Sequence, residues 1–224
     1  MLFRSVAFGL ALMVLLFACV TLHELGHAVA AQYFGIQVRN IVLLPIGGVA
    51  LLSRPARRPI HELVIAAAGP AVNVLILAVL APVLLLAGEP VAGPRSLLDP
   101  AGTTPSVMTA LHWLFGSNVG LVLFNLIPAF PLDGGRILRS LLGLAMPWLT
   151  ATRWATRVGQ ALAATMGVWA VLRGEPMLAI VSVLVFFAAA SQQAEEEAHA
   201  TLTSHPTFAV TSRSRITRSE EHTS

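Results

Sequence analysis

Residues 3–34 read FRSVAFGLALMVLLFACVTLHELGHAVAAQYF, an apolar run that is interrupted near its end by His23, Glu24 and His27. The run exceeds the roughly 20 residues that a helix needs to cross a bilayer. Ionisable side chains inside such a run are costly, so they normally face a polar cavity with a function. This stretch therefore predicts a membrane-spanning helix that carries a functional site.

The composition extends this prediction to the rest of the chain. Of the 224 residues, 56% are hydrophobic and only 11% are charged. Long apolar stretches recur at residues 3–34, 63–87, 107–127, 154–172 and 177–190. We predict an all-α polytopic membrane protein with about five transmembrane helices. Since no basic run is interleaved with aromatic residues, the sequence favours the lipid bilayer, and no nucleic acid, as a partner.

The placement of arginine predicts the orientation of the chain in the membrane. All 14 basic residues are arginine, and eight of them lie in or just beside two of the intervals between the apolar stretches. These eight are Arg39, Arg54, Arg57 and Arg58 in the first interval, Arg136, Arg139 and Arg153 in the third, and Arg157 just after the third. Because cytoplasmic loops are rich in Arg and Lys, we expect both intervals, the C-terminus and the polar end of the first span to face the cytoplasm.

The histidines of the first span have the spacing of a metal site. His23 and His27 are four positions apart, so a helix places both imidazoles on one side, as in the HExxH arrangement. Glu24 is well placed to take a proton from an attacking water and to return it to the leaving amine. Zinc suits imidazole and carboxylate ligands. The alternative is a helix end whose histidines merely cap the helix or extend towards the interface.

A catalytic zinc usually has three protein ligands, so a further histidine or carboxylate is needed. The chain has two aspartates, and Asp99 falls in an interval that is expected to be external. Asp133 follows the third apolar stretch, at the cytoplasmic end, where the first span's motif also lies. Pro128 and Pro131 before it are expected to break the helix. We therefore predict that Asp133 completes the site for one Zn²⁺ ion, with a helix-capping aspartate after a proline kink as the alternative.

Two motifs in this order resemble the site-2 protease family of intramembrane zinc metalloproteases, in the bacterial form that CBS domains often follow. They are His23-Glu-Leu-Gly-His27 and Asn125-x-x-Pro128-x-x-x-Leu-Asp133-Gly. The resemblance implies that His23, His27 and Asp133 hold zinc and that Glu24 is catalytic. It extends to Ala68-Gly69-Pro70-Ala-Val-Asn73 and to Pro45-Ile-Gly47-Gly48-Val49, and it covers about residues 8–190.

The same resemblance shapes the predicted domain organisation. Residues 1–193 are interpreted as the transmembrane metalloprotease core, without a first helix that related bacterial proteins usually carry, which would make six. Residues 194–217 are interpreted as a cytoplasmic tail, at the place where a regulatory CBS domain would start. Residues 218–224, RSEEHTS, read as a translated sequencing adapter and are expected to be an artefact.

Four further residues are candidates for binding the substrate. Asn73 and Asn125 are expected to contact the substrate backbone or the oxyanion, with hydrogen bonding between helices as the alternative. Gly47 and Gly48 lie at the bend of residues 36–52, which are expected to form a short re-entrant β-hairpin whose edge pairs with the substrate. A loop along the membrane surface is the alternative reading of that segment.

The remaining polar residues of the apolar stretches are given no chemistry. His61 and Glu62 look like half of a metal motif, but Ile65 stands where a second histidine would be needed. We expect this pair, and His112 near the external side, to be polar anchors at the membrane interface.

The leading prediction is a zinc endopeptidase that hydrolyses peptide bonds in or near the transmembrane segments of membrane-anchored regulatory proteins. Two alternatives are a catalytically inactive membrane scaffold of the same fold and a membrane metal carrier. The intact Glu24 argues against a scaffold, which has no use for a general base. A carrier would need ligand sets along a path across the membrane, and the sequence offers one three-ligand site.

Overall fold

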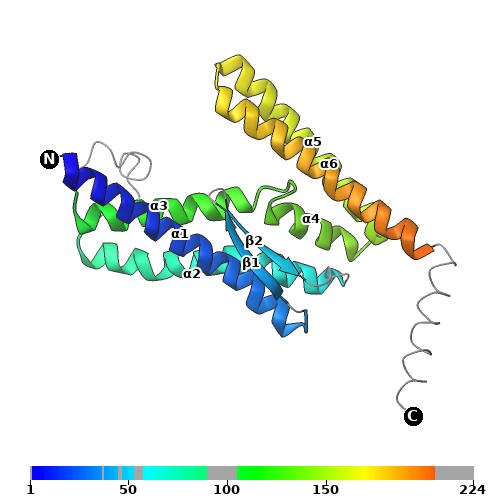
Figure 1. Cartoon of the computed structure of the whole chain (residues 1–224), viewed down its shortest axis with the longest axis horizontal. Coiled ribbons are helices and arrows are strands. Elements are labelled where there is room, and N and C mark those ends of the chain that lie inside the picture. The colour runs from blue at the N-terminus through cyan, green and yellow to red at the C-terminus, as the bar shows by residue number, and fades with distance from the viewer. Residues whose placement is uncertain (1, 37, 45–46, 53–57, 90–104, 205–224) are drawn as a thin grey trace, which may run out of the picture. The chain divides into compact units, whose positions relative to one another are not determined.

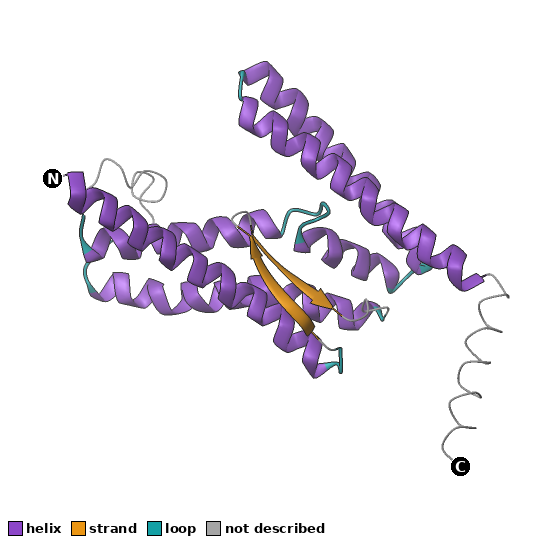
Figure 2. Ribbon diagram, in the orientation of Figure 1, coloured by secondary structure: helices purple, strands orange, loops and turns teal. Residues whose placement is uncertain are grey.

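The computed structural model describes residues 2–36, 38–44, 47–52, 58–89 and 105–204, which form six helices and a pair of strands (Figures 1 and 2). The chain divides into two compact units. The first contains residues 1–128 and 132–144, and the second contains residues 129–131 and 145–224. The candidate metal ligands all lie in the first unit.

The first unit is built around α2. This helix, Pro59–Leu86, packs against α1 (Leu2–Tyr33), α3 (Val107–Asn125) and the shorter α4 (Asp133–Gly143) (Figure 1). Proline at its first position, where no backbone donor is needed, suits the start of α2. Because α2 touches all three neighbours, it is the element against which the parts of a shared site are arranged.

Most large apolar side chains on these helices point outward. Leu10, Val14, Leu75 and Val79 are each at least 60% exposed. A water-soluble protein would bury such residues, whereas lipid tails solvate them. Among the described residues, four helices are long and apolar enough to cross a membrane, at Val6–Tyr33, Pro59–Leu86, Val107–Asn125 and Pro176–Ala198. The all-helical polytopic membrane fold predicted from the sequence is confirmed.

The count of five spans differs from the structure in one helix. The stretch at residues 154–172 is helical, as part of α5 (Trp148–Arg173), but it is not among the four spanning candidates. Its first half carries Arg157 and Gln160, which lower its mean hydropathy. The last span is longer than the 14-residue apolar stretch suggested, since its candidate segment covers 23 residues of α6 (Pro176–Ser204).

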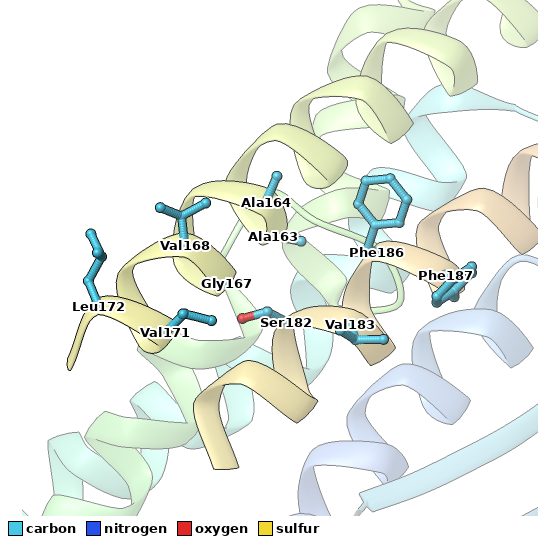
Figure 3. Close-up of a pocket in the computed structure, with 10 residues that line it drawn as sticks. All are labelled: Ala163, Ala164, Gly167, Val168, Val171, Leu172, Ser182, Val183, Phe186 and Phe187. Atoms are coloured by element: carbon cyan, nitrogen blue, oxygen red, sulfur yellow. The ribbon is translucent and has the colours of Figure 1, made fainter. Parts of the chain in front are cut away.

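The second unit is a hairpin of two long helices. α5 ends at Arg173 and is followed by Gly174, which has a φ of +70°; α6 starts at Pro176 and returns along α5. Small residues on α5 allow close packing, and Ala151, Ala155 and Ala170 are fully buried. Farther along, Gly167 of α5 and Ser182 and Phe186 of α6 contribute to an apolar pocket (Figure 3). Residue 193, the predicted end of the core, lies within α6, which continues to Ser204. Residues 205–224 lie outside the described residues.

Two strands connect α1 to α2. β1 (Val38–Leu44) and β2 (Gly47–Leu52) pair antiparallel, with Gly47 opposite Leu44 and Gly48 opposite Leu43 (Figure 2). The sheet has these two strands in the described part of the chain, so each strand keeps one unpaired edge. Both strands contact α1, which carries the two histidines of the motif. The structure therefore has a hairpin in the interval where the sequence suggested one.

Candidate metal centre

The two histidines of the motif lie on the inner face of α1. His23 and His27 are 5% and 7% exposed, whereas Leu22 and Leu25 beside them are 45% and 46% exposed. The helical period of 3.6 residues separates the two pairs in this way. The Nε2 atoms of the histidines are 3.1 Å apart, and their rings meet edge to face. The four-residue spacing of the two histidines therefore brings their Nε2 atoms together.

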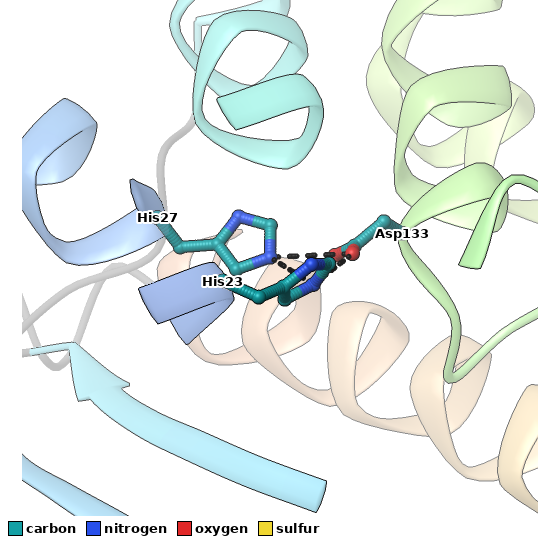
Figure 4. A group of neighbouring side chains, drawn as sticks. All are labelled: His23, His27 and Asp133. Carbon is teal, nitrogen blue, oxygen red and sulfur yellow. Dashed lines mark hydrogen bonds and ion pairs between the residues drawn. The ribbon is translucent and has the colours of Figure 1, made fainter. Parts of the chain in front are cut away.

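Asp133 meets this pair from a distant part of the sequence. It is the first residue of α4, where a carboxylate is favoured by the helix dipole, and it is 8% exposed. Its Oδ2 atom lies 3.2 Å from Nε2 of His23 and 3.2 Å from Nε2 of His27 (Figure 4). Gly134 makes the turn before α4 feasible, because a Cβ atom there would overlap the carbonyl groups of Leu126 and Ile127.

The outer nitrogen of each imidazole is held by α2. Nδ1 of His27 lies 2.7 Å from the carbonyl oxygen of Ile65, which can only accept, so this Nδ1 donates. Nδ1 of His23 donates in the same way to Oδ1 of Asn73, at 3.1 Å. Both Nε2 atoms then present lone pairs to the carboxylate of Asp133. Three lone-pair acceptors that converge in this way repel one another unless a cation lies between them, and such supporting contacts are typical of metal-bound histidine.

The distances within the triad fit zinc. A tetrahedral ion at 2.0–2.1 Å from each ligand requires ligand atoms about 3.3 Å apart. The three separations are 3.1, 3.2 and 3.2 Å. These side chains form a group of buried residues that could hold a metal ion, with three protein ligands and a fourth position open to water or substrate.

The close approach of α2 to the triad depends on a glycine. Gly69 lies directly against the two imidazoles, and a Cβ atom at this position would lie 2.6 Å from Nε2 of His23 and would overlap His27. These contacts explain two residues of the motif at residues 68–73. Gly69 leaves room for both imidazole rings, and Asn73 accepts a hydrogen bond from the ring of His23.

The charges around the triad fit a cation site. Oδ2 of Asp133 faces both histidines, and Nη1 of Arg136 lies 3.9 Å from its Oδ1. Glu24 is half-buried and lies within electrostatic range of both histidines and of Asp133. A second carboxylate is therefore beside the triad without being one of its three members.

The four predicted substrate-binding residues lie on three different elements and make different contacts. Asn73 is fully buried and bonds to His23, so the structure gives it a contact with a ligand. Asn125 is half-buried and donates to the carbonyl of Leu121 in its own helix, at 3.0 Å. Gly47 and Gly48 begin β2. Binding of substrate by these four residues stays a prediction.

The environment of Glu62, beside the centre, was not predicted from the sequence. Glu62 is 2% exposed and forms an ion pair with Arg139, so its carboxylate faces a protein partner. A charged residue so close to an apolar stretch could have signalled a buried partner. The partner could not be found, since it lies 77 positions away in the sequence.

A buried triad of two histidines and an aspartate, with a glutamate next to the first histidine and the histidines on a membrane-spanning helix, defines a membrane-embedded metallopeptidase centre. Comparison of the sequence and structure with known proteins agrees with this class. The model of peptidase family M50 matches residues 11–166, and the chain belongs to this family. The resemblance to site-2 proteases at the two motifs is confirmed.

Individual relatives support the assignment. A zinc metalloprotease of Methanocaldococcus jannaschii is 38% identical over 187 residues, which cover 81% of this chain and 49% of the relative. Stage IV sporulation protein FB of Bacillus subtilis is 29% identical over 67% of this chain and 46% of its own length. The chain thus spans about half the length of these two relatives. The solved structure of the site-2 protease from Methanocaldococcus jannaschii is similar with a TM-score of 0.57 and 35% identity, over 86% of this chain and 87% of that one.

Proposed function

We propose that this chain is an intramembrane zinc endopeptidase that hydrolyses peptide bonds in or near the transmembrane segments of membrane-anchored regulatory proteins. The observation that carries the proposal is the buried triad of His23, His27 and Asp133, whose histidines lie on a helix long and apolar enough to span a bilayer. Ionisable groups in such a helix are retained for function. Membership of peptidase family M50 supports the same chemistry.

The residues divide the work of hydrolysis between binding and proton transfer. Zinc at such a site polarises a carbonyl and makes a water molecule acidic enough to attack at neutral pH. The Glu24 carboxylate accepts the proton of the attacking water as the new C–O bond forms. It then gives the proton to the amide nitrogen as the C–N bond breaks, which leaves a carboxyl group and an amine. Asn73 and Ile65 keep the ligands in one orientation throughout.

The active site is proposed to open toward the cytoplasm. Arg136 and Arg139 of α4 lie close to Glu62. Glu62 is in the first turn of α2, so the three charged residues mark the N-terminal end of that helix. Clustered arginine marks the cytoplasmic side of a membrane protein. The opposite end of the same helix is followed by Glu89, which lies 4.0 Å from His112 of α3. A cysteine-labelling experiment with an impermeant reagent on intact cells would test this orientation, and labelling at residue 58 from outside would refute it.

Substrate is proposed to bind in extended form along the hairpin. A peptide bond inside an intact helix is shielded, so the substrate must unwind before water can attack it. The free edges of β1 and β2 offer backbone hydrogen bonds to an extended segment, and both strands contact α1. Proline substitutions at successive positions from Val38 to Val49 remove backbone donors one at a time. Unchanged cleavage by every variant would refute this mode of binding.

The central experiment is cleavage of a model transmembrane substrate by the purified chain in liposomes, with bound zinc measured in parallel. Glu24→Gln is expected to abolish cleavage and to keep zinc, because it removes the base and leaves all three ligands. His23→Ala and Asp133→Ala are expected to lose cleavage and to bind zinc much more weakly, because each removes one of the three ligands. Cleavage that survives Glu24→Gln would refute the proposal. Zinc bound to wild type without any cleavage would favour an inactive scaffold or a metal carrier.

A further inference from the structure

A buried ion pair joins α2 to α4 next to the metal centre. The carboxylate of Glu62 accepts a hydrogen bond at Oε2 from Nε of Arg139, at 3.2 Å. Its Oε1 accepts from Nη2 of the same arginine. Oγ of Ser140 lies 3.0 Å from Oε2 of Glu62 and 2.7 Å from the carbonyl oxygen of Arg136, between which its one hydrogen is shared. Glu62, Arg139 and Ser140 are 2%, 6% and 0% exposed. The proposed catalytic chemistry does not use any of these three residues.

The cluster extends to a metal ligand through Arg136. Nε of Arg136 lies 3.6 Å from Oε1 of Glu62, and its Nη1 lies 3.9 Å from Oδ1 of Asp133. The two carboxylate oxygens of Asp133 therefore have different neighbours. Oδ2 faces the histidines and Oδ1 faces the arginine. Glu62 is thus connected to the third ligand both by the helix that carries this ligand and by the side chain beside it.

Physical considerations favour a positioning role over a role in stability. A buried ion pair adds little net stability, because desolvation of both charges offsets their attraction, but it fixes geometry. A two-pronged contact between arginine and carboxylate allows one relative orientation. α4 has only 11 residues, too few for a stable helix on its own, so its place is set by packing on α2.

Glu62 also completes a pattern on α2. The helix positions 62, 65, 69 and 73 recur with the spacing of one helix face. Ile65 holds His27, Asn73 holds His23, and Gly69 leaves room for both rings. The remaining position, 62, holds the helix of Asp133. One face of α2 therefore supports every member of the triad without supplying a ligand.

We propose that Glu62 is a positioning residue for the third metal ligand, which it holds at the metal through Arg139, Ser140 and Arg136. This inference rests on the proposed function only as far as the triad binds zinc, and it does not require proteolysis. Its consequence is measurable as zinc affinity, which separates it from the cleavage assay.

The test is a double-mutant cycle on zinc affinity, measured by chelator competition with the full chain in detergent. Glu62→Gln keeps the shape of the side chain and removes its charge. It is expected to weaken zinc binding about 10- to 100-fold, the usual effect of losing a contact that orients a ligand. In the Asp133→Ala background the same change is expected to have no further effect, because the ligand that Glu62 positions is gone.

The cycle separates positioning from simpler explanations. Loss of a negative charge near the metal, or general destabilisation, would weaken zinc binding equally in both backgrounds and would overturn the proposal. A change of less than twofold in the wild-type background would also overturn it. Asn118→Ala is the matched control, since Asn118 of α3 is fully buried and its side chain donates to Cys19 of α1 and to the carbonyl of Leu114 in its own helix. At a similar loss of thermal stability, it is expected to keep zinc affinity.

A second variant decides the matter if Glu62→Gln does not fold. Arg139→Lys retains the positive charge beside Glu62 but cannot make the two-pronged contact. It is expected to weaken zinc binding by a smaller factor, about 3- to 10-fold, and again only when Asp133 is present. Wild-type zinc affinity in this variant would refute the positioning role. Absence of proteolysis by wild type would refute the proposed function and leave this zinc cycle interpretable.

Discussion

Substitution of Gly69 by alanine tests the geometry of the centre most directly. The added Cβ atom would lie 2.6 Å from Nε2 of His23. Ordinary contact between a carbon and a nitrogen atom begins near 3.4 Å, so the ring or the helix must move by about 0.8 Å. Ligand distances at a zinc site tolerate about 0.2 Å. The displacement is therefore several times what the site can absorb, while α2 itself gains helix propensity from the change.

We expect Gly69→Ala to lower zinc affinity at least 100-fold, which corresponds to about 2.8 kcal/mol. The assay is chelator competition on the purified chain, together with thermal unfolding of the zinc-free protein. Gly26→Ala is the matched control. A Cβ atom at Gly26 would lie 2.8 Å from the carbonyl oxygen of Ala68, so it crowds the same pair of helices but meets neither imidazole. It should cost stability, about 1–3 kcal/mol, and weaken zinc binding much less than Gly69→Ala does. Wild-type zinc affinity in Gly69→Ala would refute the placement of α2 against the ligands.

Three further predictions concern the supports, the metal and the second unit. Asn73→Leu removes the acceptor that holds His23 and should weaken zinc binding about 10- to 100-fold in chelator competition, whereas Asn73→Asp retains an oxygen there and should bind within a few-fold of wild type. Removal of zinc by a chelator should lower the melting temperature of the wild type, because bound metal stabilises only the folded state, and the melting temperature of Asp133→Ala, which binds zinc more weakly, should respond much less. Ala155→Leu places a larger side chain at a fully buried position of α5 and should destabilise the protein by about 1–3 kcal/mol in thermal unfolding; an unchanged melting temperature would contradict the packing of that hairpin.

The three residues of the candidate metal centre were predictable because their signals are strong and local. His23 and His27 are one helical turn apart, and helix geometry alone brings them together. Asp133 was found by elimination, since the chain has two aspartates and only one of them was expected on the cytoplasmic side. Long apolar runs are equally strong signals, which is why the membrane fold was predicted and the positions of four spans agree with the structure.

The supports of the ligands were not predictable in the same way. Asn73 was noticed, but its contact with His23 depends on which face of α2 meets α1, and periodicity in a helix that is apolar all round does not mark a face. The ion pair of Glu62 was not predictable for a related reason, since its partner Arg139 comes from a helix far along the chain. The stretch in α5 was counted as a span from its apolar residues, and Arg157 and Gln160 keep this helix out of the four candidates that length and mean hydropathy select.

The face of α2 formed by positions 62, 65, 69 and 73 also limits which changes of length this part of the sequence can accept. Each residue added to or removed from an α-helix turns everything beyond it by about 100° and shifts it by 1.5 Å. A single insertion or deletion between Glu62 and Asn73 would therefore rotate one of these two residues away from its partner, which is His23 for Asn73 and α4 for Glu62. Surface loops accept such changes in length, and helix ends often do. This segment contains no metal ligand and no catalytic group, yet its length is as restricted as the identity of the histidines.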